Sequence, residues 1–161
     1  MEVVDLSNRR GAIVHLLPKV HKLYKQTGHQ LKDIVLWTHD MNKMILDIQR
    51  KWIFVLDRPN GDVLGFLFYR MGEDGKSLHI EALRVGRHIR AFDLLIQRFQ
   101  QDNAVKARTE FYASREIQRK TNDEILATVG MQDDSIYDDN GYQHLGDLRK
   151  AVDALKVRYQ R

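Results

Sequence analysis

Apolar side chains in the first fifty residues repeat with the period of an α-helix. In residues 11–26 they recur every three or four positions, at Ile13, Leu16, Leu17, Val20 and Tyr24. The same spacing returns in residues 31–49, and Gly28 is placed to end the first helix. Pro18 lies inside the first stripe, so we expect it either to delay the start of that helix or to kink it. The pattern predicts two amphipathic helices.

After residue 51 the pattern becomes that of β-strands separated by turn residues. The segments WIFVLD (52–57) and DVLGFLFYRM (62–71) flank RPNG, in which Asn60-Gly61 is a strong signal for a two-residue hairpin, because both positions tolerate a positive φ. The sequence GEDG (72–75) marks a second turn, and SLHIEALRV (77–85) a third strand. Three consecutive strands joined by short turns predict antiparallel neighbours.

Helix and strand alternate in the second half of the chain. We expect a helix over residues 91–102 and a strand over 105–112. A further helix can start after Ser114, a favourable N-cap residue, and end at Gly130. Residues 131–145 fit a hairpin that turns at DDNG (138–141). A last amphipathic helix is predicted over 146–160, through Leu148, Val152, Leu155 and Tyr159.

The order of these elements predicts the fold class. Three consecutive strands followed by a strand–helix–strand crossover indicate an α/β (α+β) fold, in which helices flank a mixed, mostly antiparallel sheet. The length of 161 residues suits one domain over residues 1–161, with 146–160 as an appended C-terminal helix.

Composition narrows the class of protein without naming a reaction. The chain is 43% hydrophobic and 30% charged, as in ordinary globular proteins, and no apolar run approaches the roughly 20 residues of a membrane helix. It has no cysteine and no secretory signal pattern, so we expect a cytoplasmic protein without a membrane partner. The net charge of +4 is spread along the chain, which does not favour a nucleic-acid partner. The histidines are scattered and form no HExxH motif, so no metal site is predicted.

Cationic side chains gather where the strand 77–85 changes into the next helix, namely Arg84, Arg87, His88 and Arg90. A strand that leads through a cationic turn to a helix N-terminus is a common way to hold a phosphate, because unpaired N–H groups and the helix dipole attract anions. The alternative is that this stretch only connects two core elements.

The element order, the strand ending ALRV (82–85) and the helix-ending sequence ATVGM (127–131) resemble the GNAT (Gcn5-related N-acetyltransferase) superfamily, over roughly residues 10–135. The resemblance implies acetyl-CoA or coenzyme A as cofactor, with its pantetheine arm and thioester beside the backbone of Leu83 and Val85. It also implies a pyrophosphate site formed by Arg84, Arg87, His88, Arg90, Ala91 and Phe92. The turn departs from the family's glycine-rich loop, since no glycine follows Gly86 there; its cations could compensate through charge-assisted contacts.

The resemblance also implies catalytic groups. Glu81 stands where many family members carry a general base, and His79 could join it through water. The family's usual tyrosine acid falls on Leu126, so Tyr112 is the substitute candidate. Trp37 could line the acceptor end of the cleft.

Structural interpretations of the same residues stay open. Glu81 could pair with Arg84 or Arg108 as an ordinary strand carboxylate. His79, Tyr112 and Trp37 could be packing residues, which is the commoner role of such side chains.

Two functions fit these observations. The first is an acyl-CoA-dependent N-acyltransferase, transferring acetyl to a small-molecule or protein amine. The second is a catalytically silent binding or assembly protein of the same fold, which could be virus-encoded. It could form a homo-oligomer or join a larger assembly, using the helix 146–160 as a contact surface.

Overall fold

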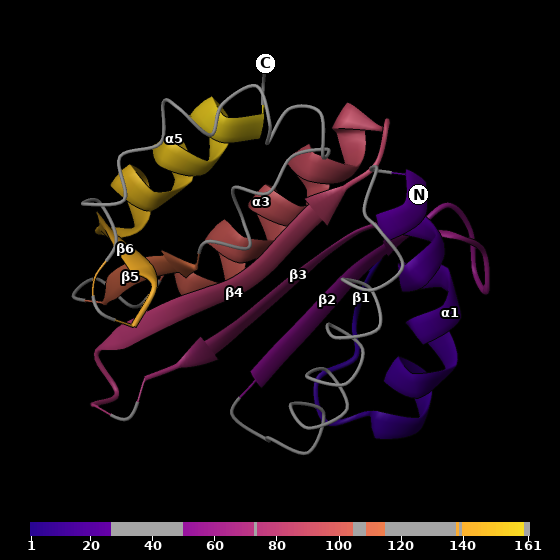
Figure 1. Cartoon of the computed structure of the whole chain (residues 1–161), viewed down its shortest axis with the longest axis horizontal. Coiled ribbons are helices and arrows are strands. Elements are labelled where there is room, and N and C mark those ends of the chain that lie inside the picture. The colour runs from indigo at the N-terminus through magenta and orange to yellow at the C-terminus, as the bar shows by residue number, and fades with distance from the viewer. Residues whose placement is uncertain (27–49, 73, 105–108, 115–137, 139, 160–161) are drawn as a thin grey trace.

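The computed structural model describes residues 1–26, 50–72, 74–104, 109–114, 138 and 140–159. In these residues six strands form one sheet, and helices lie on both of its faces (Figure 1). The strands are β1 (Glu2–Asp5), β2 (Arg50–Leu56), β3 (Val63–Met71), β4 (Ser77–Val85), β5 (Glu110–Ser114) and β6 (Tyr142–Gly146). The helices are α1 (Arg10–Gln26), α3 (Ile89–Asn103) and α5 (Leu148–Tyr159).

The strands lie in the sheet in the order of the sequence, from β1 to β6. All neighbours are antiparallel except β4 and β5, which are parallel. A parallel pair needs a crossover connection, and α3 provides its helix. The predicted fold class, a mixed and mostly antiparallel sheet flanked by helices with an extra C-terminal helix, is therefore confirmed.

Each face of the sheet has its own hydrophobic core. On one face, α1 packs its buried stripe over the aromatic side chains of Trp52, Phe54, Phe66 and Phe68. On the other face, α3 and α5 pack together over residues such as Leu67, Ile80 and Phe111. The strands between these layers are buried on both sides, which explains their nearly continuous apolar runs.

The sequence pattern does not predict β1, and the structure corrects this. The strand has four residues, too few for a periodic signal, although Val3 and Val4 are β-branched. It pairs with β2 from Glu2 opposite Leu56 to Asp5 opposite Ile53.

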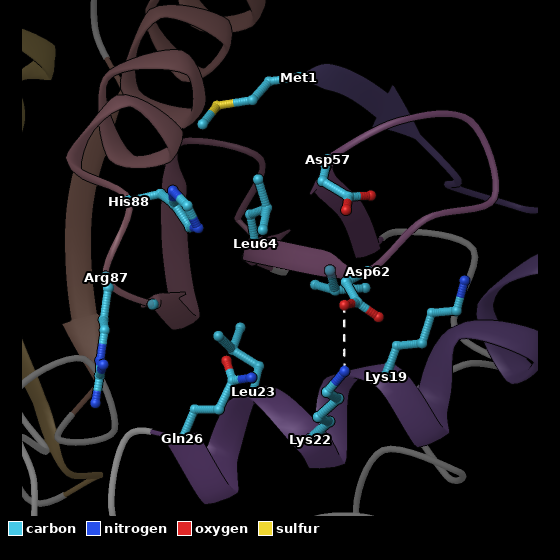
Figure 2. Close-up of a pocket in the computed structure, with 12 residues that line it drawn as sticks. Met1, Lys19, Lys22, Leu23, Gln26, Asp57, Asp62, Leu64, Arg87 and His88 are labelled. Atoms are coloured by element: carbon cyan, nitrogen blue, oxygen red, sulfur yellow. Dashed lines mark hydrogen bonds and ion pairs between the residues drawn. The ribbon is translucent and has the colours of Figure 1, made fainter.

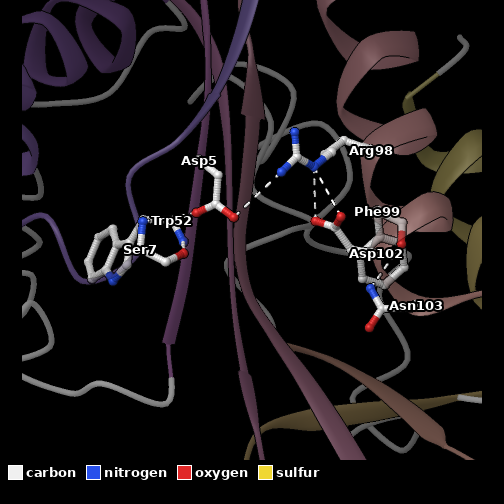
Figure 3. A network of polar contacts seen from close by, with 7 residues as sticks. All are labelled: Asp5, Ser7, Trp52, Arg98, Phe99, Asp102 and Asn103. Carbon is white, nitrogen blue, oxygen red and sulfur yellow. Dashed lines mark hydrogen bonds and ion pairs between the residues drawn. The ribbon is translucent and has the colours of Figure 1, made fainter. Parts of the chain in front are cut away.

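Polar contacts attach β1 to the rest of the molecule (Figure 3). Asp5 lies 3.7 Å from the Arg98 guanidinium on α3, which also contacts Asp102 through Nε at 3.0 Å. The backbone N–H of Trp52 donates to the Ser7 hydroxyl at 3.1 Å. Arg98 thus connects β1 and α3 through two carboxylates, one from Asp5 and one from its own helix.

The connection between β2 and β3 differs from the predicted two-residue hairpin. The Asp57 N–H donates to the Asp62 carbonyl at 3.1 Å, which encloses four residues in the loop. Within it, the Gly61 N–H donates to Arg58 at 2.8 Å, and Asn60 has a φ of 59°. The hairpin is therefore confirmed, but its turn is longer.

Other boundaries also shift. Helix α1 begins at Arg10 and continues through Pro18, so the late start is excluded. Helix α3 begins at Ile89, two residues earlier than expected, and β5 runs from Glu110 to Ser114. The turn at residues 138–141 is confirmed, with Gly141 at a φ of 81° and a hydrogen bond from the Asp138 N–H to the Tyr142 carbonyl.

Several predictions lie outside the described residues. They are the end of the first helix at Gly28, the helix over 31–49 and the helix from Ser114 to Gly130. In the part of the chain that is described, no helix combines the length and apolar character needed to cross a membrane.

Candidate functional site

A β-bulge in β4 determines where the Glu81 side chain lies. In the ladder between β3 and β4, Phe68 pairs with Ala82 and Tyr69 with Ile80, so Glu81 is the extra residue. A bulge interrupts the alternation of side chains and turns one of them in a new direction. Glu81 lies on the same face of the sheet as Arg70 and Tyr142, as its contacts demonstrate, and the bulge places Ala82 on that face as well.

The Glu81 carboxylate is held by residues from three other strands. It accepts a hydrogen bond from Arg70 Nε on β3 at 2.6 Å, and Arg50 Nη1 on β2 lies 3.5 Å from it. The Tyr142 hydroxyl on β6 is 3.0 Å from both carboxylate oxygens. Burial, followed by the charge of Glu81, raises the pKa of the Tyr142 phenol, which therefore stays a neutral donor at pH 7.

These contacts correct the expected ion pairs of Glu81. Its partners are Arg70 and Arg50 rather than Arg84, whose buried guanidinium carbon lies 5.3 Å from the centre of the Tyr24 ring. Arg108 lies outside the described residues.

Next to Glu81, five polar residues occupy directly paired positions on five successive strands. We call them the polar row: Arg50, Arg70, His79, Tyr112 and His144. Directly paired residues share one face of a sheet. This is the α1 face, since neighbouring Leu78, Ile80 and Phe111 belong to the opposite core.

Ring contacts connect the row. The His79 ring stacks on Tyr112 with 5.1 Å between centroids, and it meets the Tyr142 ring edge-on at 4.8 Å. Tyr112 in turn lies 5.0 Å from the His144 ring, and His144 pairs with Glu110. Burial, followed by the charge of Arg70, lowers the pKa of His79, so its imidazole is neutral at pH 7.

Beyond the polar row, β4 extends past its pairing with β5. The described ladder runs from Ser77 opposite Glu110 to Ile80 opposite Ala113, whereas β4 continues to Val85. The Ser114 hydroxyl donates to the Glu81 carbonyl at 2.7 Å, on the side of β4 that faces β5.

The backbone of Leu83 and Val85 faces the same side of β4 as this carbonyl. The Gly86 N–H donates to Leu64 on β3 at 3.0 Å, and backbone directions alternate along an antiparallel strand. The N–H and C=O groups of Leu83 and Val85 therefore point away from β3 and toward β5.

The turn from β4 to α3 is shorter than predicted. It consists of Gly86, Arg87 and His88, with His88 in an extended N-cap conformation that makes no side-chain capping hydrogen bond. Arg90, Ala91 and Phe92 belong to the first turn of α3 and not to a loop. The side chains of Ala91 and Phe92 are buried in the core, so only their backbone can face a ligand.

The charged side chains of this turn are exposed. Arg87, His88 and Arg90 make no ion pair with any residue that the structure describes. Arg84 is buried, so of the four cationic residues only three can contact an external anion through their side chains.

A cleft of about 610 Å³ lies between α1, the β2–β3 loop and the β4–α3 turn (Figure 2). Arg87 and His88 are on one side, and Lys22 pairs with Asp62 at 3.2 Å on the other. Lys19 Nζ contacts the carbonyls of Asn60 and Gly61. These contacts attach α1 to the β2–β3 loop.

The structure brings together some of the predicted site residues and separates others. Glu81, His79 and Tyr112 lie in one cluster, whereas Arg87, His88 and Arg90 form a second group at the end of β4. Trp37 lies outside the described residues. Among those described, histidine, aspartate and glutamate side chains do not gather into a group that could hold a metal ion.

Sequence reasoning missed Arg50, Arg70, Tyr142 and His144. They are distant in the sequence, and only strand register places them beside Glu81. Arg50 and Arg70 flank a predicted hairpin, so a correct loop length could have paired them.

No protein-family model and no curated protein matches this sequence. Solved structures do match. Aminoglycoside 6'-acetyltransferase type Ii aligns over 70% of this chain and 70% of its own, with a TM-score of 0.53 and 14% identity. A "probable acetyltransferase" aligns over 86% of this chain and 95% of its own, with a TM-score of 0.53 and 14% identity. An aminoglycoside 6'-N-acetyltransferase complexed with coenzyme A aligns over 70% and 61%, with a TM-score of 0.50 and 12% identity. At these identities the likeness establishes a shared fold.

Proposed function

We propose that this chain, which has the fold of the GNAT acetyltransferases and a divergent sequence, transfers an acyl group from coenzyme A to an amine, with acetyl as the first group to test. The observation that carries the proposal is the position of Glu81. Its carboxylate lies on a β-bulge where the described β4–β5 ladder ends and β4 continues to Val85. A carboxylate on this strand is a suitable base for an amine that attacks a thioester.

Coenzyme A would supply the activated acyl thioester, and one structural neighbour is described as complexed with coenzyme A. We propose that its pantetheine runs along the C-terminal end of β4 beside Val85, whose N–H and C=O groups face β5. The pyrophosphate would lie at the N-terminus of α3, near Arg87, His88 and Arg90. The exposed cations fit this group, because side chains can reach a phosphate even where glycines no longer allow close backbone approach.

Glu81 would take the proton that the amine loses as its nitrogen bonds to the thioester carbonyl carbon. Among the described residues its Oε2 accepts one hydrogen bond, from the Tyr142 hydroxyl, and a carboxylate oxygen can accept two. We propose Tyr112 as the donor that protonates the departing thiolate. The polar row holds the Tyr112 ring between His79 and His144.

The proposal is tested by the effect of acetyl-CoA on the melting temperature. A ligand that binds the folded state raises this temperature with its concentration. We expect a rise with the parent chain, and a dissociation constant at least tenfold weaker after Arg87→Gln with Arg90→Gln, because each charge-assisted contact contributes about 1.5–3 kcal/mol. Arg149→Gln, an exposed change on α5, is the matched control.

Glu81→Gln separates binding from chemistry. This variant should still be stabilised by acetyl-CoA but release coenzyme A at least 100-fold more slowly in the presence of an accepted amine, since a general base contributes about 10²–10⁴-fold. Unchanged turnover would exclude Glu81 as the base. If millimolar acetyl-CoA does not stabilise the parent chain, the silent binding or assembly protein is the better assignment. The several donors that already hold Glu81 favour that second function.

A further inference from the structure

We infer that the acceptor amine also carries an anionic group, a carboxylate or a phosphate, and that the arginine end of the polar row recognises it. The inference rests on the proposed function and names the substrate class of the same site. It distinguishes this chain from the acetyltransferases that share its fold and whose acceptors by name are aminoglycosides.

Hydrogen-bond donors are concentrated at the arginine end of the polar row. Arg50 and Arg70 are direct cross-strand partners, and both lie within 3.5 Å of the same Glu81 oxygen. Like charges on directly paired residues destabilise a sheet, and the single negative charge of Glu81 offsets only one of the two arginines. A guanidinium has five N–H donors, and the contact with Glu81 uses one nitrogen of Arg70, Nε. The Arg70 side chain is 26% exposed, so a ligand can reach it.

The carboxylates near the polar row, among the described residues, already have hydrogen-bond or ion-pair partners. Glu110 pairs with His144, and Glu81 with the two arginines. Asp74 accepts hydrogen bonds from the backbone of Lys76 and Ser77, and Asp138 from that of Asn140 and Tyr142. An incoming ammonium group would have to compete with these partners, whereas an anion would find donors.

The arginines lie close to the proposed base. Glu81 contacts Arg70 directly, so the anionic group and the reacting nitrogen would bind close together. The full row crosses four strand spacings of roughly 4.8 Å, about 19 Å in total, but its arginines cover only one of them. This geometry fits a compact acceptor that has both groups on a small skeleton.

The test uses pairs of amines that differ in the anionic group. The parent chain is assayed for coenzyme A release with glucosamine and glucosamine 6-phosphate, with cadaverine and lysine, and with kanamycin. We expect kcat/KM to be at least tenfold higher for the anionic member of one or both pairs than for its partner and for kanamycin. A preference in the sugar pair indicates phosphate, and one in the lysine pair indicates a carboxylate.

Variants identify the arginines as the source of the preference. Arg50→Gln should reduce the ratio of kcat/KM within the preferred pair by about tenfold. Arg50→Lys should retain part of it, and Arg149→Gln should not change it. The ratio is the informative quantity, because a general loss of rate from a disturbed Glu81 affects both amines equally. Equal use of both members, a preference for kanamycin, or an unchanged ratio in Arg50→Gln would overturn the inference.

A binding measurement separates this inference from the proposed function. If acetyl-CoA neither stabilises the chain nor reacts with any amine, the acyltransferase assignment fails. Stabilisation by glucosamine 6-phosphate or lysine but not by glucosamine or cadaverine, lost in Arg50→Gln, would still establish the anion site. Absence of that stabilisation would overturn it.

Discussion

His79 is the titratable residue of the polar row whose charge state the fold controls most directly. Burial and the neighbouring Arg70 lower its pKa below the ordinary value of 6.5, and Glu81, Asp74 and Asp138 oppose them without reversing the direction. The folded chain therefore takes up fewer protons than the unfolded chain as the pH falls below about 6.5.

We expect the free energy of unfolding to decrease between pH 7.5 and pH 5.5, measured by urea unfolding at each pH. His79→Gln should flatten part of this decrease, because glutamine does not titrate. Part of the slope should persist, since burial and Lys25 also lower the pKa of His21. Exchange of the exposed His15 for glutamine is the control. A slope unchanged in His79→Gln would show that His79 is not the source.

For single residues, the sequence predicts which side chains could belong to the site but not which side chains they contact. The alternating pattern of residues 77–85 identifies Glu81 and His79 as neighbours on one strand. The contacts of Glu81 with Arg70 and Tyr142 depend on a bulge and on two strand registers, and a register shift of one residue would reverse the faces. Such contacts cannot be read from hydrophobic periodicity.

The N-terminus of α3 lacks a side-chain capping hydrogen bond, although its N-cap residue has a suitable backbone conformation. His88 has the extended conformation of an N-cap, yet its side chain accepts no hydrogen bond from the helix. Serine and aspartate are favourable at this position because their oxygen satisfies one of the unpaired N–H groups.

We predict that His88→Ser and His88→Asp each raise the free energy of unfolding by about 0.5–2 kcal/mol, measured by urea denaturation. The two variants should differ in acetyl-CoA binding, since the aspartate adds negative charge where the pyrophosphate is proposed to bind. Weaker binding in His88→Asp than in His88→Ser is therefore expected. Equal affinities would place the pyrophosphate elsewhere.

Helices and strands could be predicted from the sequence where the hydrophobic pattern is long. Their first and last residues could not. The strands β2, β3 and β4 and the helix α3 follow from runs of seven or more residues, as in Val63–Met71 and Ile89–Asn103. The four residues of β1 give no periodic signal, and the Asn60-Gly61 signal does not specify the length of its loop. The pairing of β2 with β1 and with β3 determines both the existence of β1 and the length of this loop.

Helix α5 follows the last strand of the sheet, yet it contributes to the hydrophobic core. Ala151, Val152 and Leu155 are buried in the same core as α3 and β5. The helix is thus part of the packing on that face of the sheet.

Leu155→Ala should therefore lower the free energy of unfolding by about 2–5 kcal/mol, because it removes buried methyl groups and leaves a cavity. Val157→Ala, two residues further along α5, changes a side chain that is 65% exposed and should alter it by less than about 0.5 kcal/mol. Chemical denaturation measures both. Similar values for the two variants would mean that α5 contributes little to the core.

The fold class followed from element order alone, because consecutive strands with short turns and one crossover allow few topologies. The candidate site could not be predicted from element order, because it combines residues from β2 to β6.

The pairing of β1 has a consequence for how the chain acquires its fold during synthesis. Glu2 has its partner in Leu56, so during synthesis β1 stays without its partner strand until the chain has grown through β2. Closing so long a loop costs entropy before any pairing compensates for it. β1 is therefore a segment that a chaperone could hold until β2 has been synthesised.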